Sequence, residues 1–124
     1  MTPIIRDMRR ADIPAVAALE AEIYPQPWSP RVFFDELAMD SRVYVVAHDD
    51  EGHILGYGGL LLVEDDAHIT TIAVAPEARG RGVGRALVEA AEREAIEHEC
   101  VTMRLEIRED NEASIALFKA CGFR

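Results

Sequence analysis

Cysteine and histidine are scarce in this chain. Its 124 residues include two cysteines, Cys100 and Cys121, which do not form a C-x-x-C pair and follow no export signal. We therefore expect buried free thiols rather than a disulfide framework. The four histidines are scattered along the sequence, and none stands four residues from another, so no metal site is predicted.

Long hydrophobic runs and an excess of positive charge are also missing. No run approaches the roughly eighteen apolar residues of a membrane span, and the N-terminus lacks the charged-then-apolar layout of a signal peptide. We therefore expect a cytoplasmic protein that does not contact a membrane. Lys and Arg number 13 against 23 Asp and Glu, which gives a net charge of −10. That charge argues against general nucleic-acid binding and is compatible with a basic peptide or an amine as partner.

The composition is that of a globular protein, with 49% hydrophobic and 29% charged residues. This balance and the length predict one domain, residues 1–124, with a single hydrophobic core. Asp12 and Ser29 are the expected N-caps of the first two helices. The predicted elements, in order, are a strand over 4–8, helices over 13–23 and 30–39, strands over 43–47, 54–63 and 67–74, a helix that begins near 83, a strand over 101–107 and a short helix over 111–121.

Three arginines lie within seven residues in the run R-G-R-G-V-G-R from Arg79 to Arg85, between an apolar run and a helical pattern. Glycines let backbone N–H groups turn inward, and a helix N-terminus adds its positive dipole. Arginine supplies forked donors that match phosphate oxygens. The run therefore predicts a phosphate-binding turn. The alternative is a flexible turn that only starts the helix.

The residues of this turn match one phosphate-binding motif and exclude two others. Both G-x-G-x-x-G and G-x-x-x-x-G-K-[ST] are absent. The sequence fits R-x-x-G-x-G instead, with Arg79, Gly82 and Gly84, preceded by I-A-V-x-P over 72–76. This string resembles the acetyl-CoA pyrophosphate loop of the GNAT N-acetyltransferase family. The resemblance implies acetyl-CoA as co-substrate, no metal, and a cofactor site made of Ile72, Ala73, Val74, Arg79, Gly80, Arg81, Gly82, Val83, Gly84 and Arg85.

The predicted element order, β-α-α-β-β-β-α-β-α, resembles the GNAT fold, a mixed α/β fold with a mostly antiparallel sheet flanked by helices. That family normally adds two strands after the final helix, and this sequence ends at Arg124, where the first of them should start. We therefore expect a fold truncated before its last two strands, with an open edge on the strand over 101–107. Either the chain is a fragment or another subunit covers that edge, so a monomer and a homodimer both remain open.

A candidate general base lies in the strand over 101–107. Alternation along this strand separates an apolar face, with Val101 and Met103, from a polar face, with Arg104 and Glu106. A carboxylate at a strand end beside a thioester can accept the proton that an ammonium loses before its nitrogen attacks. Glu106 is therefore the candidate. The alternative is a solvated strand residue paired with a neighbouring arginine.

The stretch L-E-I-R-x-x-N-x-x-x-I-A-L-F-x-x-x-G-F, residues 105–123, resembles the bacterial ribosomal-protein-alanine N-acetyltransferases, the RimI group. Pro27-Trp28-Ser29 resembles the segment between the first two helices of that group. The resemblance implies that Glu106 is the proton acceptor and that Asn111 contacts the cofactor, a role compatible with capping the last helix. It also implies that the acceptor is the N-terminal peptide of a protein, with ribosomal proteins as the class.

Phe118 occupies the position where the RimI group has its proton-donor tyrosine. Phenylalanine keeps the packing of that side chain and loses its hydroxyl. A missing general acid costs roughly 10²- to 10⁴-fold in rate. An alkyl thiolate is a tolerable leaving group, because thiols of this kind have a pKa near ~8.5, so we expect a loss at the lower end and a packing role for Phe118.

Two side chains, Trp28 and His68, have two interpretations each. Tyr24 and Trp28 line the groove for the acceptor peptide, as the resemblance implies, or Trp28 fills the core beside the first two helices. His68 is either an auxiliary base or an ordinary strand residue.

Three functions remain open at this point. The main hypothesis is direct transfer of acetyl from acetyl-CoA to an N-terminal amine, which loses its proton more easily at a pKa near ~8 than a lysine does near ~10.4. The second is acetylation of a small amine or a lysine side chain, against which the Pro27-Trp28-Ser29 segment argues. The third, suggested by Phe118 and the absent strands, is an acetyl-CoA-binding module with little catalysis.

Overall fold

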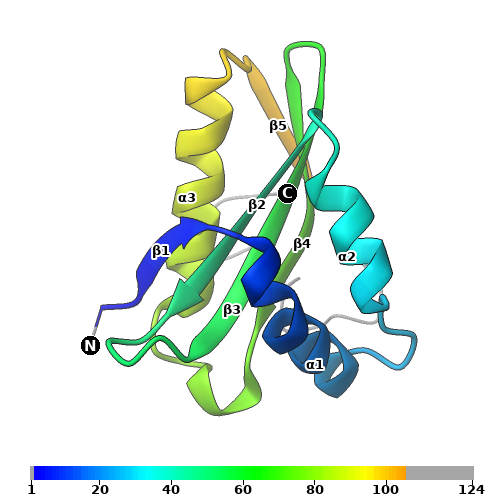
Figure 1. Ribbon diagram of the computed structural model, residues 1–124. Coiled ribbons are helices and arrows are strands. Elements are labelled where there is room, and N and C mark those ends of the chain that lie inside the picture. Colours follow the sequence, from blue (N-terminus) through cyan, green and yellow to red (C-terminus); the bar gives the residue numbers. More distant parts are fainter. Residues whose placement is uncertain (1, 106–124) are drawn as a thin grey trace.

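A computed structural model describes residues 2–105 of the chain (Figure 1). Over this range it confirms the predicted order up to the fifth strand, with short 3₁₀ turns added at Arg10–Asp12 and Pro76–Ala78. The predicted helix over 111–121 lies outside the described residues. The elements are β1 (Ile4–Asp7), α1 (Ile13–Ile23), α2 (Pro30–Leu37), β2 (Arg42–His48), β3 (Ile54–Val63), β4 (Asp66–Val74), α3 (Val83–Glu97) and β5 (Thr102–Leu105).

The described strands form one mixed sheet in the order β1-β2-β3-β4-β5. The first four pair antiparallel, and the register places Val45 opposite Gly58 and Tyr57 opposite Ala73. β5 pairs parallel to β4, because α3 carries the chain back along the sheet before β5 begins. The expected α/β class with a mostly antiparallel sheet is thus confirmed.

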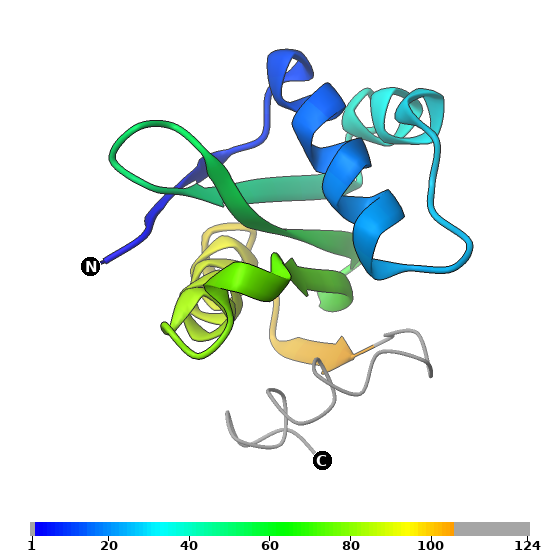
Figure 2. The same ribbon diagram turned by 90° about the horizontal axis from the view of Figure 1, so that it is seen from below.

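Helices cover both faces of this sheet. α1 and α2 pack on one face and α3 on the other, an arrangement that is clear when the molecule is viewed from below (Figure 2). The buried side of α3 carries small and aliphatic residues at helical spacing, including Leu87, Ala91 and Ala95. The sheet is therefore the middle of three layers, with a hydrophobic core on each side of it.

Of the two predicted N-caps, the one at Ser29 is confirmed and the one at Asp12 is wrong. Ser29 caps α2, since its hydroxyl accepts a hydrogen bond from the Val32 N–H at 3.4 Å. Asp12 does not cap α1: its carboxylate accepts from the Arg9 N–H at 2.8 Å and from both terminal nitrogens of Arg6 at 2.7 and 2.8 Å. The 3₁₀ turn that precedes α1 leaves Asp12 in a helical conformation, so its side chain points back to β1.

The predicted alternation in the fifth strand is confirmed in part. Met103 is half-buried between the exposed Thr102 and Arg104. Val101, which we expected on the apolar face, is 75% exposed. It lies before the first residue of β5, so the sheet does not orient its side chain.

Candidate active site

The candidate site is built on β4 and its two edges. β3 pairs with one edge along the whole strand, and the described residues of β5, Thr102–Leu105, pair with Asp66–Ile69 on the second edge. Past Ile69, no described strand pairs with this second edge of β4. The strand nevertheless continues to Val74 and into the glycine-rich turn.

Hydrogen bonding identifies the residues of β4 that face this second edge. The Ala75 N–H donates to the Leu55 carbonyl of β3 at 2.8 Å. Backbone groups alternate between the two edges of an antiparallel strand, so Ala73 also faces β3, while Ile72 and Val74 face away from it. The Val74 carbonyl accepts a hydrogen bond from Arg79 Nε at 3.4 Å, which holds the Arg79 side chain along this edge.

Residues 79–82 form an exposed turn between β4 and α3, which we call the glycine loop. Gly80 and Gly82 have φ angles of +79° and +82°, a conformation that favours glycine over other residues. Among the described residues, apart from the two chain neighbours of each glycine, no atom lies within 4 Å of the position a Cβ would take at either one. The loop is therefore open on the outside and presents main chain there.

The N-terminus of α3 follows the glycine loop directly. The Ala86 N–H donates to the Gly82 carbonyl at 3.0 Å and begins the helical ladder, so the N–H groups of residues 83–85 precede it. No described side chain caps this end. Val83, 2% exposed, anchors the helix in the core, while Arg79, Arg81 and Arg85 are exposed.

The end of β4, the glycine loop and the first turn of α3 thus contain all the described members of the predicted cofactor set. Glycine main chain, a helix N-terminus and three arginines form an arrangement that fits a diphosphate. The roles of the individual residues remain predictions. Three predicted site residues, Glu106, Asn111 and Phe118, lie outside the described residues.

The two residues predicted to line an acceptor groove lie on the other face of the sheet. They belong to the segment Tyr24–Ser29 between α1 and α2, which we call the α1–α2 segment. Tyr24 is buried, with 5% of its surface exposed, and Trp28 is half-buried. The Trp28 ring packs edge-on against Phe33, with centroids 5.4 Å apart and planes at 61°. Packing is therefore observed for both, and a contact with the acceptor stays a prediction.

A buried carboxylate in this region was missed from the sequence. Glu20 of α1 is 2% exposed, accepts a hydrogen bond from the Trp28 N–H at 2.9 Å and accepts a second from the Tyr57 hydroxyl. The signal was present, because Glu20 continues the helical stripe of Ile13, Val16 and Ala17, all of them buried apolar residues. A charged residue on an apolar stripe needs partners inside the protein.

A second tyrosine of the sheet is bound to a second helical glutamate. The Tyr44 hydroxyl donates to Glu36 Oε1 at 2.8 Å, and Arg42 Nε donates to the same atom at 3.0 Å. Burial, followed by the bond to Glu36, raises the pKa of Tyr44 above its usual value. This cluster fastens α2 to β2, as the Glu20 cluster fastens α1 to β3.

His68, the possible auxiliary base, is half-buried in β4 opposite Arg104 of β5. Its role remains a prediction. Among residues 2–105 no group of three or more His, Cys, Asp or Glu is placed to hold a metal ion. No helix in this part of the chain is long and apolar enough to cross a membrane.

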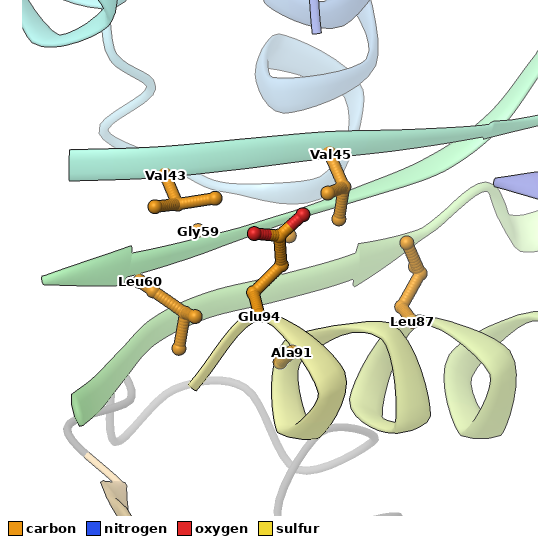
Figure 3. Close-up of a pocket in the computed structure, with 8 residues that line it drawn as sticks. Val43, Val45, Gly59, Leu60, Leu87, Ala91 and Glu94 are labelled. Carbon is orange, nitrogen blue, oxygen red and sulfur yellow. The ribbon is translucent and has the colours of Figure 1, made fainter. Parts of the chain in front are cut away.

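A small pocket opens on the α3 face, away from the glycine loop (Figure 3). It lies between α3 and the strands β2 and β3, with Val43, Val45 and Leu60 among its apolar lining. Glu94 of α3 contributes a carboxylate. Burial, and then the charges of Asp7 and Glu97, raise the pKa of this carboxyl.

Comparison with known proteins agrees with this geometry. The family model described as "Acetyltransferase (GNAT) family" matches residues 13–123. The chain belongs to this family. As a GNAT protein it is an acetyl-CoA-dependent N-acetyltransferase, and the family assignment inferred from the glycine loop is confirmed.

Two curated relatives and one solved structure show which GNAT proteins the chain is similar to. The chain is 36% identical to the "N-alpha-acetyltransferase RimI" of Mycobacterium tuberculosis, over 94% of this chain and 75% of that protein. It is 33% identical to a "[Ribosomal protein bS18]-alanine N-acetyltransferase" of Salmonella typhimurium, over 90% of this chain and 74% of that protein. The crystal structure of the ribosomal-protein-S18-alanine N-acetyltransferase from Escherichia coli superposes with a TM-score of 0.84 and 28% identity, over 99% of this chain and 78% of that one. The resemblance to the RimI group is thus confirmed.

Proposed function

We propose that this GNAT enzyme transfers the acetyl group of acetyl-CoA to the α-amino group of a protein N-terminus, with a ribosomal protein as the acceptor. The observation that carries the proposal is the match to an N-alpha-acetyltransferase over 94% of the chain. A match of this extent includes the glycine loop and also the α1–α2 segment on the opposite face. The net charge of −10 is complementary to a basic acceptor.

In this proposal the glycine loop and the start of α3 hold the diphosphate of acetyl-CoA. Main-chain N–H groups of residues 80–85 donate to its oxygens, and the exposed arginines add charge-assisted bonds. Ile72 and Val74 pair their main-chain groups with the pantetheine amides, because these groups face the edge of β4 that is turned away from β3. Asn111 adds a side-chain contact. When bound, acetyl-CoA supplies an acetyl group activated as a thioester.

Proton transfer is assigned to Glu106, which directly follows the last residue of β5 in the sequence. Its carboxylate takes the proton of the acceptor ammonium, directly or through a water molecule. Tyr24 and Trp28 line the acceptor side. With Phe118 in place of a tyrosine, the thiolate leaves without a proton from this position, and we expect turnover to be lowered for that reason.

The reaction takes place in the cytoplasm in this proposal, where acetyl-CoA and ribosomal proteins meet. The experiment that tests it is an acetylation assay on pairs of peptides of equal length. One member has a free N-terminus and no lysine, and the other has a blocked N-terminus and one internal lysine. We expect acetylation of the first only. Acetylation of the second alone would establish the lysine alternative, and tight CoA binding without turnover on either would establish the binding module.

Two variants test the assigned chemistry. Glu106→Gln should lower kcat by about 10²-fold or more and remove the acidic limb of the pH profile, while Glu97→Gln, an exposed carboxylate of α3, should change neither. An unchanged rate and pH profile in Glu106→Gln would refute the base assignment. Phe118→Tyr should raise turnover, and the absence of a gain would mean that thiolate departure needs no acid.

A further inference from the structure

We propose that Glu20 is a positioning residue for the acceptor: its buried carboxylate fixes the α1–α2 segment and thereby the wall that the acceptor peptide meets. This inference rests on the proposed function, in which that segment lines the acceptor side. Glu20 itself is 2% exposed and lies inside the protein, so it acts through Trp28 rather than on the substrate.

The first argument is that three elements of the chain meet at this one carboxylate. Glu20 belongs to α1, the Trp28 N–H that bonds Oε2 belongs to the α1–α2 segment, and the Tyr57 hydroxyl that bonds Oε1 belongs to β3. Each oxygen accepts from a different partner. A carboxylate offers two equivalent acceptor oxygens, whereas glutamine keeps one acceptor oxygen and replaces the other with an NH₂ group that can only donate.

The second argument is that aromatic packing holds the same segment from its other side. Phe33 packs edge-on against Trp28 and against Tyr57, with centroid distances of 5.4 and 5.9 Å. The contacts thus close a ring, from Glu20 to Trp28, to Phe33, to Tyr57 and back to Glu20. Trp28 is held at its backbone by a hydrogen bond and at its indole by an aromatic contact.

The third argument concerns the position of this ring of contacts relative to the reaction. Tyr57 lies opposite Ala73 in the β3–β4 register, and adjacent strands are about 4.8 Å apart. The ring is therefore one strand away from the edge of β4 that carries Ile72 and Val74. A shift of Glu20 would move the acceptor wall relative to this edge, while the glycine loop on the other face would stay in place.

The fourth argument is that stability alone does not explain a buried carboxylate here. Well-packed apolar residues in place of buried charged groups are often neutral or favourable for stability. Glu20 interrupts an otherwise apolar stripe of α1, where an aliphatic side chain would serve the core. What the carboxylate adds is a directed bond to the backbone of Trp28.

The experiment compares Glu20→Gln and Tyr57→Phe with a matched control, Tyr44→Phe. The control also removes a sheet tyrosine hydroxyl bonded to a helical glutamate, but that bond joins β2 to α2 and does not involve Trp28. Each full-length variant is measured for thermal stability, for KM and kcat with an N-terminal peptide, for KM with acetyl-CoA, and for the fluorescence and acrylamide quenching of Trp28, the single tryptophan of the chain.

We expect Glu20→Gln to raise the acceptor KM about tenfold, the equivalent of one buried charge-assisted hydrogen bond, with the acetyl-CoA KM changed less than about twofold. Tyr57→Phe should give a smaller rise in the same KM, and both should increase the quenching of Trp28. Tyr44→Phe should lower thermal stability like Tyr57→Phe but leave the acceptor KM and the quenching unchanged.

Two results would overturn the inference: a loss of stability in Glu20→Gln and Tyr57→Phe with unchanged acceptor KM and quenching, or an equal rise of the acceptor KM in Tyr44→Phe. Failure of the proposed function has a different signature, because the wild-type enzyme would then acetylate no N-terminal peptide. In that case the quenching of Trp28 still decides whether Glu20 fixes the segment.

Discussion

The cofactor side of the molecule, made of the end of β4, the glycine loop and α3, presents main chain and exposed arginines. The acceptor side, made of α1, the α1–α2 segment and α2, is held by bonds between buried side chains. On the first side the important groups are neighbours in sequence, within residues 72–86. On the second, Glu20 and Tyr57 are 37 residues apart, and the contact exists only in the folded protein.

This contrast indicates which amino-acid substitutions each side of the site can tolerate. A main-chain cradle tolerates changes of the side chains around it, provided that its glycines keep their conformations. The buried ring of contacts does not, because the loss of Glu20 or Tyr57 removes a hydrogen bond in a low-dielectric interior and the loss of Phe33 leaves a cavity. Substitutions in the ring of contacts should therefore act on stability and acceptor binding together, whereas substitutions in the glycine loop should affect the binding of acetyl-CoA and leave acceptor binding unchanged.

The largest effect is expected for Phe33→Ala on the acceptor side. Phe33 is 1% exposed and links Trp28 to Tyr57, and removal of a buried phenylalanine costs about 3–5 kcal/mol of unfolding free energy. The control is Phe34→Ala in the same helix, where the ring is 43% exposed and contacts Arg10 at 4.8 Å, an interaction of about 0.5–1 kcal/mol. Urea unfolding measures both. Equal losses would contradict the picture of a buried ring of contacts.

The next effect is expected for Gly82→Ala on the cofactor side, with Gly52→Ala as its control. Both glycines have a positive φ, +82° and +88°, and at neither would a Cβ meet an atom within 4 Å. Each variant should lose about 1–2 kcal/mol of stability from backbone strain. Only Gly82→Ala should also raise the Kd of acetyl-CoA, by about tenfold or more, because displaced N–H groups lose charge-assisted bonds. Calorimetric titration with acetyl-CoA distinguishes the two variants.

The same contrast explains what sequence analysis could and could not predict. The glycine loop is a local pattern whose letters dictate main-chain conformation, so its place after β4 and before α3 followed from the sequence. Ser29 followed for the same reason. The partners of Glu20 did not, since the helical stripe indicates that Glu20 is buried but not which donors will face it. The error at Asp12 is also non-local, because Arg6 of β1 competes for its carboxylate.

A smaller effect on stability is expected on the acceptor side when the pH is lowered, because Asp12 at the start of α1 then loses its charge. The hydrogen bonds from Arg6, against an opposing effect of burial, lower the pKa of this carboxyl. A lowered folded-state pKa contributes stability that is present above the unfolded value of about 3.9 and is lost as the pH falls through the lowered one. Asp12→Asn should therefore cost roughly 1 kcal/mol at pH 7 and much less near pH 2.

The control for Asp12 is Asp35→Asn, which breaks an exposed pair with Arg31 in α2. The side chains of Asp35 and Arg31 are 55% and 83% exposed. We therefore expect Asp35→Asn to lower the free energy of unfolding by about 0.5 kcal/mol or less at pH 7. Urea unfolding of both variants at the two pH values measures the difference. A cost of Asp12→Asn that does not change with pH would mean that the carboxylate contributes by shape rather than by charge.

Glu94 on the cofactor side should respond to pH with the opposite sign and the smallest effect. Its pKa is raised, first by burial and then by Asp7 and Glu97, so the folded state favours the protonated form, and stability is lost as the pH rises through the raised pKa. Glu94→Gln should therefore stabilise the protein by a few tenths of a kcal/mol at pH 8 and not at all near pH 3. Glu89→Gln, an exposed position of the same helix, should change stability at neither pH. A destabilised Glu94→Gln at pH 8 would show that the carboxylate has a favourable partner in the α3 pocket, and the contrast between the two sides would then fail at this position.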